Sequence, residues 1–280
     1  MRSLVLGATG IVGGHIVDQL VRAGERPLAL SRSPPPDHRP VTWVRCDLAD
    51  PDDLHLPSFS TLFCTAHAGL LAGALPRLFQ PDLRRVVLFT STSIATKINS
   101  TIESERNGLR RLAEGEHQTR AMCGKLGVSW TVLRPTLIYD EGRDINVTRL
   151  AGLIRRFGVM PLSGAGAGLR QPVHAEDLAI GALDAASSPA AANKVYDLPG
   201  GDTVSYREMV ERIFDGLNKP RRIVRIPPVL WRTGFWLARP LISNANVAMG
   251  DRMAKNMTFD AEPARRDFGW KPRGFHPRFC

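Results

Sequence analysis

Three glycines follow the first apolar run of the chain, in a spacing that could hold a phosphate group. The stretch LVLGATGIVGGH places Gly7, Gly10 and Gly13 between an expected strand and an expected helix. In this spacing the first glycine allows the tight turn, the second lets backbone amides approach a pyrophosphate, and the third lets helix and strand pack closely. The positive end of the helix then faces the phosphate. The sequence therefore predicts a dinucleotide site, with an ordinary glycine-rich turn as the alternative. Neighbouring residues expected to line that site are Thr9, Ile11 and Val12.

The end of the second expected strand bears on which dinucleotide is bound. An NAD site places an acidic residue here, about 20 residues beyond the glycines, to accept hydrogen bonds from the adenosine ribose. This sequence reads LALSRSPPP instead. Ser31 and Arg32 offer donors and a positive charge where a carboxylate would repel a 2′-phosphate. We therefore predict NADP as the cofactor, with NAD as the alternative, and a solvated strand-end arginine as the other interpretation of Arg32.

The segment CDLAD follows the third expected strand and extends the predicted site. Asp47 could accept a hydrogen bond from the adenine amino group, with Leu48 beside it. The alternative role of Asp47 is to cap the turn that follows. Both interpretations place Asp47 at the end of a strand.

Short apolar runs alternate with helical patterns, as a parallel sheet covered on both faces requires. The expected strands span residues 2–6, 27–30, 42–45, 61–64, 85–89, 129–133 and 194–197. The expected helices span residues 11–22, 109–126, 145–157, 175–187 and 205–217, and the glycines at 115 and 124 weaken the second of these patterns. We predict an α/β fold, a Rossmann-type doubly wound parallel sheet with a small C-terminal substrate-binding region. Residues 1–140, with a further core strand near 194–197, form the dinucleotide-binding core, and residues 141–280 are mainly the substrate-binding region.

Charge and cysteine usage exclude several classes of protein. The chain of 280 residues carries a net charge of +10, but its basic residues are scattered in short pairs and no nucleic-acid-binding motif accompanies them. The four cysteines lie far apart with no CxxC pair, which argues against a zinc site and indicates reduced thiols in a cytoplasmic setting. We therefore expect a cytoplasmic protein with a small-molecule ligand, no metal and no nucleic-acid partner.

Residues 226–242, IPPVLWRTGFWLARPLI, combine aromatic and apolar side chains with two arginines. This composition suits a helix that lies at a membrane surface, and the segment is too short and charged to span a bilayer. A helix that packs on the substrate-binding region is the alternative. The sequence thus leaves peripheral membrane contact open, together with the oligomeric state.

Several segments together resemble the extended and atypical short-chain dehydrogenase/reductases, the NAD-dependent epimerase/dehydratase family. The segments are GATGIVG, CDLAD, VVLFTSTS, LRPTLIYDEGRD, RQPVHAEDLA and FDAEPARRDFGW, and they extend over nearly the whole chain. The resemblance implies a bound dinucleotide and a small or nucleotide-sugar substrate. It does not identify that substrate.

The resemblance also implies roles for particular residues. Those expected to line the cofactor are Thr65 and Ala66 after the fourth strand, and Pro135 and Thr136 beside the nicotinamide. Ser91 and Thr92 are placed at the reacting end, with Thr92 at the position of the family's substrate-binding Ser or Thr. Their alternative role is to satisfy backbone groups at the strand end.

Arg170 matches the arginine that pairs with the substrate diphosphate in nucleotide-sugar members of the family. Its alternative role is that of an ion-pairing residue at the surface. His174 and Tyr139, in two of the family segments, are expected to be structural, through hydrogen bonding and packing respectively.

One family feature is absent. Catalytic members carry Tyr-x-x-x-Lys on a helix, where the lysine lowers the pKa of the phenol so that it can exchange a proton as hydride moves. Here the corresponding positions fall on Arg106 and Arg110, and the three tyrosines of the chain, Tyr139, Tyr196 and Tyr206, all lie downstream. The standard proton-transfer pair is missing.

Three hypotheses follow from this absence. Another titratable group could move the proton, with Glu103, Glu105, His67, His117 and Lys97 as the nearest candidates in sequence. Alternatively, Arg106 or Arg110 could stabilise a charged intermediate. We favour an NAD(P)-binding oxidoreductase or epimerase-like enzyme without the Tyr/Lys pair, and the third hypothesis, a non-catalytic NADP-sensing or scaffolding protein, is the alternative.

Overall fold

The chain forms two compact units, and each unit is built from three separate segments of the sequence. The computed structural model describes residues 2–35, 39–50, 54–96, 100, 102–227, 229–231 and 247–279. The first unit comprises Met1–Thr136, Ala175–Leu198 and Asp260–Lys271, and the second comprises Leu137–His174, Pro199–Phe259 and Pro272–Cys280. The first unit thus includes two segments from beyond residue 140. The first of them, residues 175–198, supplies a helix and a strand that complete the layers of this unit.

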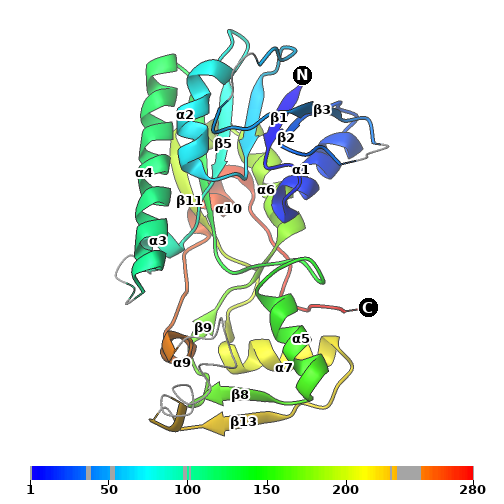
Figure 1. Cartoon of the computed structure of the whole chain (residues 1–280), viewed down its shortest axis with the longest axis vertical. Helices are drawn as coiled ribbons and strands as arrows, with labels where there is room; N and C mark the ends of the chain where they lie inside the picture. The colour runs from blue at the N-terminus through cyan, green and yellow to red at the C-terminus, as the bar shows by residue number, and fades with distance from the viewer. Residues whose placement is uncertain are drawn as a thin grey trace. The chain divides into compact units, whose positions relative to one another are not determined.

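A seven-stranded sheet forms the centre of the first unit (Figure 1). The order is β11-β6-β5-β4-β1-β2-β3, and all neighbours are parallel. The strands are β1 (Ser3–Leu6), β2 (Leu28–Ser31), β3 (Thr42–Arg45), β4 (Thr61–Cys64), β5 (Arg85–Phe89), β6 (Ser129–Pro135) and β11 (Lys194–Leu198). The Rossmann-type prediction is confirmed, and each expected strand agrees within two residues. Because the order reverses between β1 and β4, this is the point where such folds bind ligands, outside the carboxyl ends of the strands.

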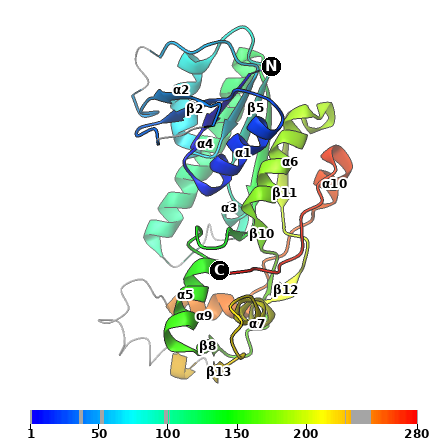
Figure 2. The ribbon, with the colours of Figure 1, turned by 90° about the vertical axis from the view of Figure 1, so that its right-hand side faces the viewer.

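Helices cover both faces of this sheet. On one face α1 (Ile11–Arg22) packs against α6 (Ala175–Ser187), and on the other α2 (Ala68–Leu78) packs against α4 (Glu103–Leu126) (Figures 1 and 2). Shorter elements of this unit are α3 (Ser93–Thr96), the 3-10 turn η1 (Pro189–Ala191) and α10 (Glu262–Phe268). A cluster of buried apolar side chains between the sheet and the α2/α4 layer forms one core of the unit. The strands are therefore largely buried on both faces, as their apolar sequences require, except for the edge strand β3, whose residues are exposed or half-buried.

Helix α4 begins at Glu103, six residues before the expected helix at 109–126. Its glycines differ in role. A Cβ atom at Gly115 would lie 2.3 Å from the amide nitrogen of Gly69 in α2, whereas a Cβ at Gly124 would meet nothing within 4 Å. Gly115 therefore allows close approach of the two helices, which explains a residue that otherwise weakens a helical pattern.

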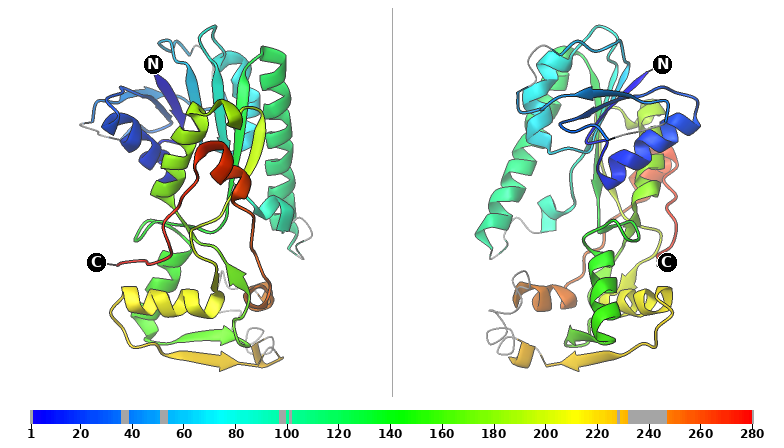
Figure 3. Two further views of the ribbon diagram at one scale, coloured as in Figure 1. Left: turned by 180° about the vertical axis from the view of Figure 1, so that it is seen from behind. Right: turned by 45° about the vertical axis from the view of Figure 1, so that its right-hand side comes forward.

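The second unit combines helices with three short strand pairs. Its helices are α5 (Val147–Phe157), α7 (Tyr206–Gly216) and α9 (Val247–Ala254), and α5 contacts both α7 and β8 (Figure 3). The strand pairs are β7 (Ile138–Tyr139) with β10 (Val173–His174), β9 (Leu169–Arg170) with β12 (Val204–Ser205), and β8 (Met160–Ser163) with β13 (Ile223–Ile226). The helices expected at 145–157 and 205–217 are present with slightly later starts. The strand pairs were not expected, since most are too short to show a period in the sequence.

Most of the segment 226–242 lies outside the described residues, so the expected interfacial helix stays a prediction. Within the described part of the chain, no helix combines the length and apolar character needed to cross a membrane.

Candidate functional site

The turn between β1 and α1 is built from its glycines. Gly7 has a φ of +77°, in the left-handed region that favours glycine, and its carbonyl accepts a hydrogen bond from the Gly10 amide at 2.9 Å. A Cβ at Gly13 would lie only 2.1 Å from the Gly7 carbonyl oxygen. The first and third glycines of the motif are therefore required by the fold of the turn itself.

Gly10 differs from the other two glycines. A Cβ at this position would meet only the Gly7 carbonyl oxygen, at 3.2 Å, and both Thr9 and Gly10 are exposed. Helix α1 begins at Ile11, with no side-chain cap and no acidic residue in its first turn. Val12 is buried in the core. The turn thus leaves open space beside an uncapped helix N-terminus, which fits the phosphates of a dinucleotide.

Thr65 joins the end of β4 to the same turn. Its hydroxyl donates toward the carbonyl oxygens of Leu6 and Gly7, each at 3.1 Å. A Cβ at Gly7 would lie 2.6 Å from Thr65 Oγ1 and 2.9 Å from the amide nitrogen of Ala66. Thr65 and Ala66 therefore lie against the glycine turn, as the sequence motifs implied.

The ends of β2 and β3 lie at the same edge of the sheet as the turn. Ser31 ends β2, and its hydroxyl accepts a hydrogen bond from the Ser33 amide at 3.2 Å. Arg32 is exposed, and no hydrogen bond or ion pair joins its side chain to another described residue. Its positive charge is therefore available to a ligand at this edge.

Asp47 and Leu48 follow β3. The Asp47 carboxylate accepts a hydrogen bond from the Ala49 amide at 3.0 Å, so the turn-capping role is observed. Asp47 is exposed, whereas Leu48 packs against the core of the first unit. A contact of Asp47 with adenine stays a prediction.

Ser91 and Thr92 follow β5 and lie beside the end of β6. The amide and hydroxyl of Thr92 both donate to the Pro135 carbonyl oxygen, at 3.2 and 3.1 Å, and Thr92 is only 5% exposed. The Ser91 hydroxyl accepts a hydrogen bond from the Ser93 amide at 3.1 Å. The Thr136 amide donates to the Leu198 carbonyl of β11.

These contacts give the two hydroxyls different chemistry. A hydroxyl has one proton to donate and two lone pairs to accept with. The proton of Thr92 is committed to Pro135, so toward a ligand Thr92 acts as an acceptor. The Ser91 proton makes no contact with another described residue, so Ser91 is the available donor of the pair.

The positions of the missing Tyr/Lys pair lie in α4. Arg106 donates from Nη1 to the Ser100 carbonyl oxygen at 2.6 Å, and Arg110 is exposed. Among the other candidates, Glu103 and Glu105 lie in the first turn of α4, His67 caps α2 by accepting from the Gly69 amide, His117 is exposed, and Lys97 lies outside the described residues. A proton-transfer role for any of them stays a prediction.

Arg170 lies buried in the second unit. Its guanidinium donates to the backbone carbonyl oxygens of Leu169, Lys255 and Arg252, at 2.7, 2.6 and 2.5 Å. Burial lowers the pKa of Arg170, and the positive charge of Arg252 lowers it further, against the effect of Tyr206. These contacts fasten β9 to the end of α9. Pairing with a substrate diphosphate stays a prediction, whereas the alternative of a surface ion-pairing residue is wrong, because burial directs the guanidinium to carbonyl groups.

His174 joins β10 to the loop after β7. Its Nε2 lies 3.2 Å from Glu141 and 3.9 Å from Asp140, and its ring meets that of Tyr139 edge to face. Burial raises the pKa of Glu141, but the hydrogen bonds with His174 and with the backbone amides of Glu141 and Arg278, together with the charge of His174, outweigh burial, so the net shift of the pKa is downward. Among the described residues, Asp140, Glu141 and His174 are the group whose ligand atoms lie close enough for a metal ion. Each already has protein partners, as expected of the structural roles predicted for His174 and Tyr139.

An ion pair between a buried carboxylate and a partly exposed arginine, not predicted from the sequence, lies beneath the ends of β5 and β6. Glu116 of α4 is 3% exposed and accepts hydrogen bonds from Arg134 at 2.6 and 3.1 Å and from the Thr90 hydroxyl at 2.9 Å. A signal was present in the sequence, because Glu116 interrupts an otherwise apolar or small stripe at helical spacing, formed by residues 109, 112, 116, 119 and 123. A charge in such a stripe requires a buried partner.

Asp197 of β11 pairs in register with Arg134, and both border a cavity of about 290 Å³. Burial raises the pKa of the Asp197 carboxyl, and Glu116 raises it further, while Arg134 acts in the opposite direction. No hydrogen bond or ion pair joins the Asp197 side chain to another described residue. Folding therefore disfavours the charged form of the Asp197 carboxyl relative to the unfolded chain.

Asp197→Asn is expected to raise the melting temperature at pH 7. Because the pKa is raised on folding, the stabilisation from the neutral form is full below the ordinary pKa of about 3.9 and is lost as pH rises through the raised pKa. Asparagine removes this cost at neutral pH. Thermal melts of both proteins at several pH values between 3.5 and 8 measure the difference, which should vanish at the acidic end. A lower melting temperature for the variant at pH 7 would contradict this account.

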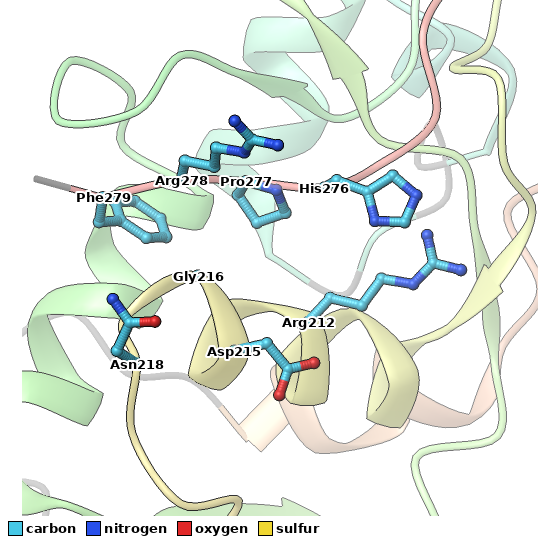
Figure 4. A pocket seen from close by; sticks show the side chains of 8 residues that line it. All are labelled: Arg212, Asp215, Gly216, Asn218, His276, Pro277, Arg278 and Phe279. Carbon is cyan, nitrogen blue, oxygen red and sulfur yellow. The ribbon is translucent and has the colours of Figure 1, made fainter.

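A second cavity, of about 490 Å³, lies in the second unit. Figure 4 shows Arg212 and His276 toward one end and Asn218 and Phe279 toward the other. The Arg212 guanidinium is bound by Asp202, Glu208 and the Phe275 carbonyl, so its charge is already compensated. None of the predicted cofactor or catalytic residues lines this cavity, and it is not the candidate site.

The sheet order, the glycine turn and the helix N-terminus define a Rossmann-type α/β protein with a candidate site at the carboxyl edge of its sheet. Comparison with known proteins agrees with this class. The sequence model of the NAD dependent epimerase/dehydratase family matches residues 3–60. A 2-alkyl-3-oxoalkanoate reductase from Stenotrophomonas maltophilia is 26% identical, over 98% of this chain and 95% of its own.

Two further relatives differ in what their names describe. An alpha subcomplex subunit 9 of the mitochondrial NADH dehydrogenase from Arabidopsis thaliana is 24% identical over 80% of this chain and 60% of its own. The solved structure of MoeE5 in complex with UDP-glucuronic acid and NAD superposes with a TM-score of 0.73 at 21% identity, covering 98% of this chain and 95% of its own. Together the matches show that the chain is similar to proteins of the extended short-chain dehydrogenase/reductase type, in sequence over its first residues and in fold over nearly its whole length.

Proposed function

We propose that the protein is an NADP(H)-dependent oxidoreductase that acts on a carbonyl or hydroxyl group without the Tyr/Lys pair. The observation that carries the cofactor proposal is the combination of the open Gly10 turn with the exposed charge of Arg32 just after β2, which has no partner among the described residues. Both lie at the carboxyl edge of the sheet, beside the point where the strand order reverses.

The donors present suit a nicotinamide dinucleotide with a 2′-phosphate. The first-turn amides of α1 suit the pyrophosphate, and Ser31 and Arg32 suit the 2′-phosphate, because arginine binds phosphate through two parallel donors. The relative with the oxoalkanoate reductase name matches almost the whole chain, which favours a small ketone or its alcohol as substrate class. The guanidinium of Arg170 already donates to three backbone carbonyl oxygens, so fewer of its donors are left for the diphosphate of a nucleotide sugar. This also favours a small ketone or alcohol as the substrate.

When bound, the dinucleotide supplies the hydride. In this proposal the Ser91 hydroxyl donates a hydrogen bond to the substrate oxygen, the proton that completes the reduction comes from solvent water, and Thr92 holds the Pro135 carbonyl where the nicotinamide would lie. Donors aimed at an oxygen that gains negative charge stabilise the transition state without a phenol. The arrangement therefore offers a route to turnover with the residues that the chain has.

Arg32→Ala is expected to weaken NADPH binding and leave NADH binding unchanged. Loss of a charged hydrogen-bond partner costs about 1.5–3 kcal/mol, or roughly 10- to 150-fold in Kd. Calorimetric titration of both cofactors measures the change. Arg84→Ala is a matched control, because Arg84 is also exposed but precedes β5, at the opposite edge of the sheet. Equal affinities of the parent protein for NADPH and NADH would overturn the NADP assignment.

The second candidate function is a non-catalytic NADP-sensing or scaffolding protein. It is favoured by the two arginines in α4 where catalytic members carry Tyr and Lys, and by similarity to a protein named as a subunit of a larger complex. A panel of ketones, alcohols and nucleotide sugars, assayed with NADPH and NADP⁺, separates the candidates. Tight NADPH binding without turnover on any of them, together with cofactor-dependent capture of a partner protein, would favour the sensor.

A further inference from the structure

Glu116 occupies a position in α4 that an apolar side chain could fill. Its carboxylate is 3% exposed and meets Arg134 at two points, through Nη2 at 2.6 Å and Nε at 3.1 Å. The Thr90 hydroxyl donates to the same carboxylate at 2.9 Å, and Arg120 lies at its rim at 3.8 Å. Because desolvation offsets most of the attraction within a buried ion pair, such a pair adds little net stability over an apolar one. Its directed hydrogen bonds fix geometry instead.

The partners of Glu116 stand directly before the reacting end of the candidate site. Thr90 is the first residue after β5 and lies two residues before Thr92. Arg134 immediately precedes Pro135, whose carbonyl receives both hydrogen bonds of Thr92. The Thr90 amide also donates to the Leu133 carbonyl at 2.9 Å. One carboxylate thus fastens the two strand ends that carry the predicted nicotinamide and catalytic residues.

The adenine side of the candidate site is held by different contacts. The glycine turn is fastened by Thr65 and by the Gly10 amide, and Arg32 and Asp47 lie at the ends of β2 and β3. No described contact joins Glu116 to any of these residues. A disturbance at Glu116 should therefore reach the β5 and β6 ends and leave the adenine side unchanged.

We propose that Glu116 is a positioning residue for the nicotinamide end of the cofactor, acting through Thr90 and Arg134 on Thr92 and Pro135. This inference rests on the proposed dinucleotide function. It assigns to the centre of α4 a role in orienting the reacting half of the ligand.

The test is Glu116→Gln, which keeps the size of the side chain but removes its charge. Titrations of NADPH and NADH are compared with 2′,5′-ADP and ADP-ribose, which carry the adenine half and lack the nicotinamide. We expect the Kd of the preferred intact cofactor to rise on the order of 10-fold, as for a lost charge-assisted hydrogen bond, and the Kd of the matching fragment to stay within about twofold.

Two further variants make the result interpretable. Thr90→Val removes one hydrogen bond and leaves the ion pair, so it should show the same selectivity with a smaller effect, even if Glu116→Gln does not fold. Arg120→Gln changes a charge at the rim of the same carboxylate and should change neither affinity. Thermal melts of each variant record any loss of stability.

The outcomes separate the two proposals. Equal weakening of the intact cofactor and its fragment would mean that Glu116 acts on the fold as a whole, and unchanged affinities would mean that it positions nothing. Either result overturns the inference while dinucleotide binding stands. A parent protein that binds none of the four ligands would overturn the proposed function and this inference together.

Discussion

Gly10→Val is expected to abolish dinucleotide binding while the protein stays folded. The Cβ position at Gly10 meets only the Gly7 carbonyl oxygen, at 3.2 Å, so a side chain can be accommodated by a small shift of the turn. The valine methyl groups would then occupy the space beside the α1 amides, where the pyrophosphate is expected. Losing charge-assisted hydrogen bonds worth about 1.5–3 kcal/mol each should weaken binding at least about 100-fold.

Fluorescence titration with NADPH measures this loss, and circular dichroism checks the fold. Gly73→Val is the matched control, because Gly73 lies on the exposed side of α2 and a Cβ there meets nothing within 4 Å. The control should bind as the parent protein does. Binding retained by Gly10→Val would mean that the motif is only a turn. Gly13→Val is unsuitable as a test, since its Cβ would collide with backbone 2.1 Å away and unfold the turn.

Ser91→Ala is expected to reduce turnover by about 10²–10³-fold on any substrate that the protein converts. Removing one donor to a developing oxyanion has an effect of this size. The loss should appear in kcat, with KM little changed, because the hydrogen bond from Ser91 to the substrate oxygen is strongest in the transition state. Steady-state kinetics with NADPH on the best ketone of the panel measure it. The Ser91 hydroxyl also accepts from the Ser93 amide, so a thermal melt must show that the variant is folded.

Two variants at Thr92 complete this test. Thr92→Ser keeps the hydroxyl that donates to Pro135 and should retain most of the activity. Thr92→Val removes it in a buried position and should lower both stability and turnover. A Ser91→Ala variant as active as the parent, beside an inactive but stable Thr92→Val, would reverse the roles assigned to the two hydroxyls.

The sheet could be predicted from the sequence because its signals are local. Each strand of the first unit is a short apolar run bounded by polar or turn residues, and the glycine turn identifies the first of them. The short pairs of the second unit carry no such signal. Strands such as Ile138–Tyr139 and Leu169–Arg170 exist because distant segments meet there, and their pairing depends on contacts that no local pattern encodes.

The residues of the candidate site also fall into those that a local sequence signal predicts and those that it does not. Gly7 and Gly13 are determined by backbone geometry, so their spacing alone indicated their role. Arg170 is a contrasting case, because the family resemblance implied a diphosphate partner, which stays a prediction, and nothing in the sequence indicated that the guanidinium donates to backbone carbonyls of a segment more than 80 residues away. Hydrogen-bond direction is not encoded in residue type, and for the same reason the different availability of the Ser91 and Thr92 protons was not predictable.

The order in which the first unit takes its segments bears on how the protein is made. Its edge strand β11 and helix α10 come from residues 194–198 and 262–268, while β1 to β6 are complete by residue 135. During synthesis, β6 therefore leaves the ribosome as an open strand edge and stays uncovered until residues 194–198 have also been translated. Domains generally fold from the N-terminus as they emerge, and unpaired strand edges are prone to aggregate. Expression of residues 1–140 alone would leave that edge permanently open, so recombinant work on the first unit calls for a chain that includes β11 and α10.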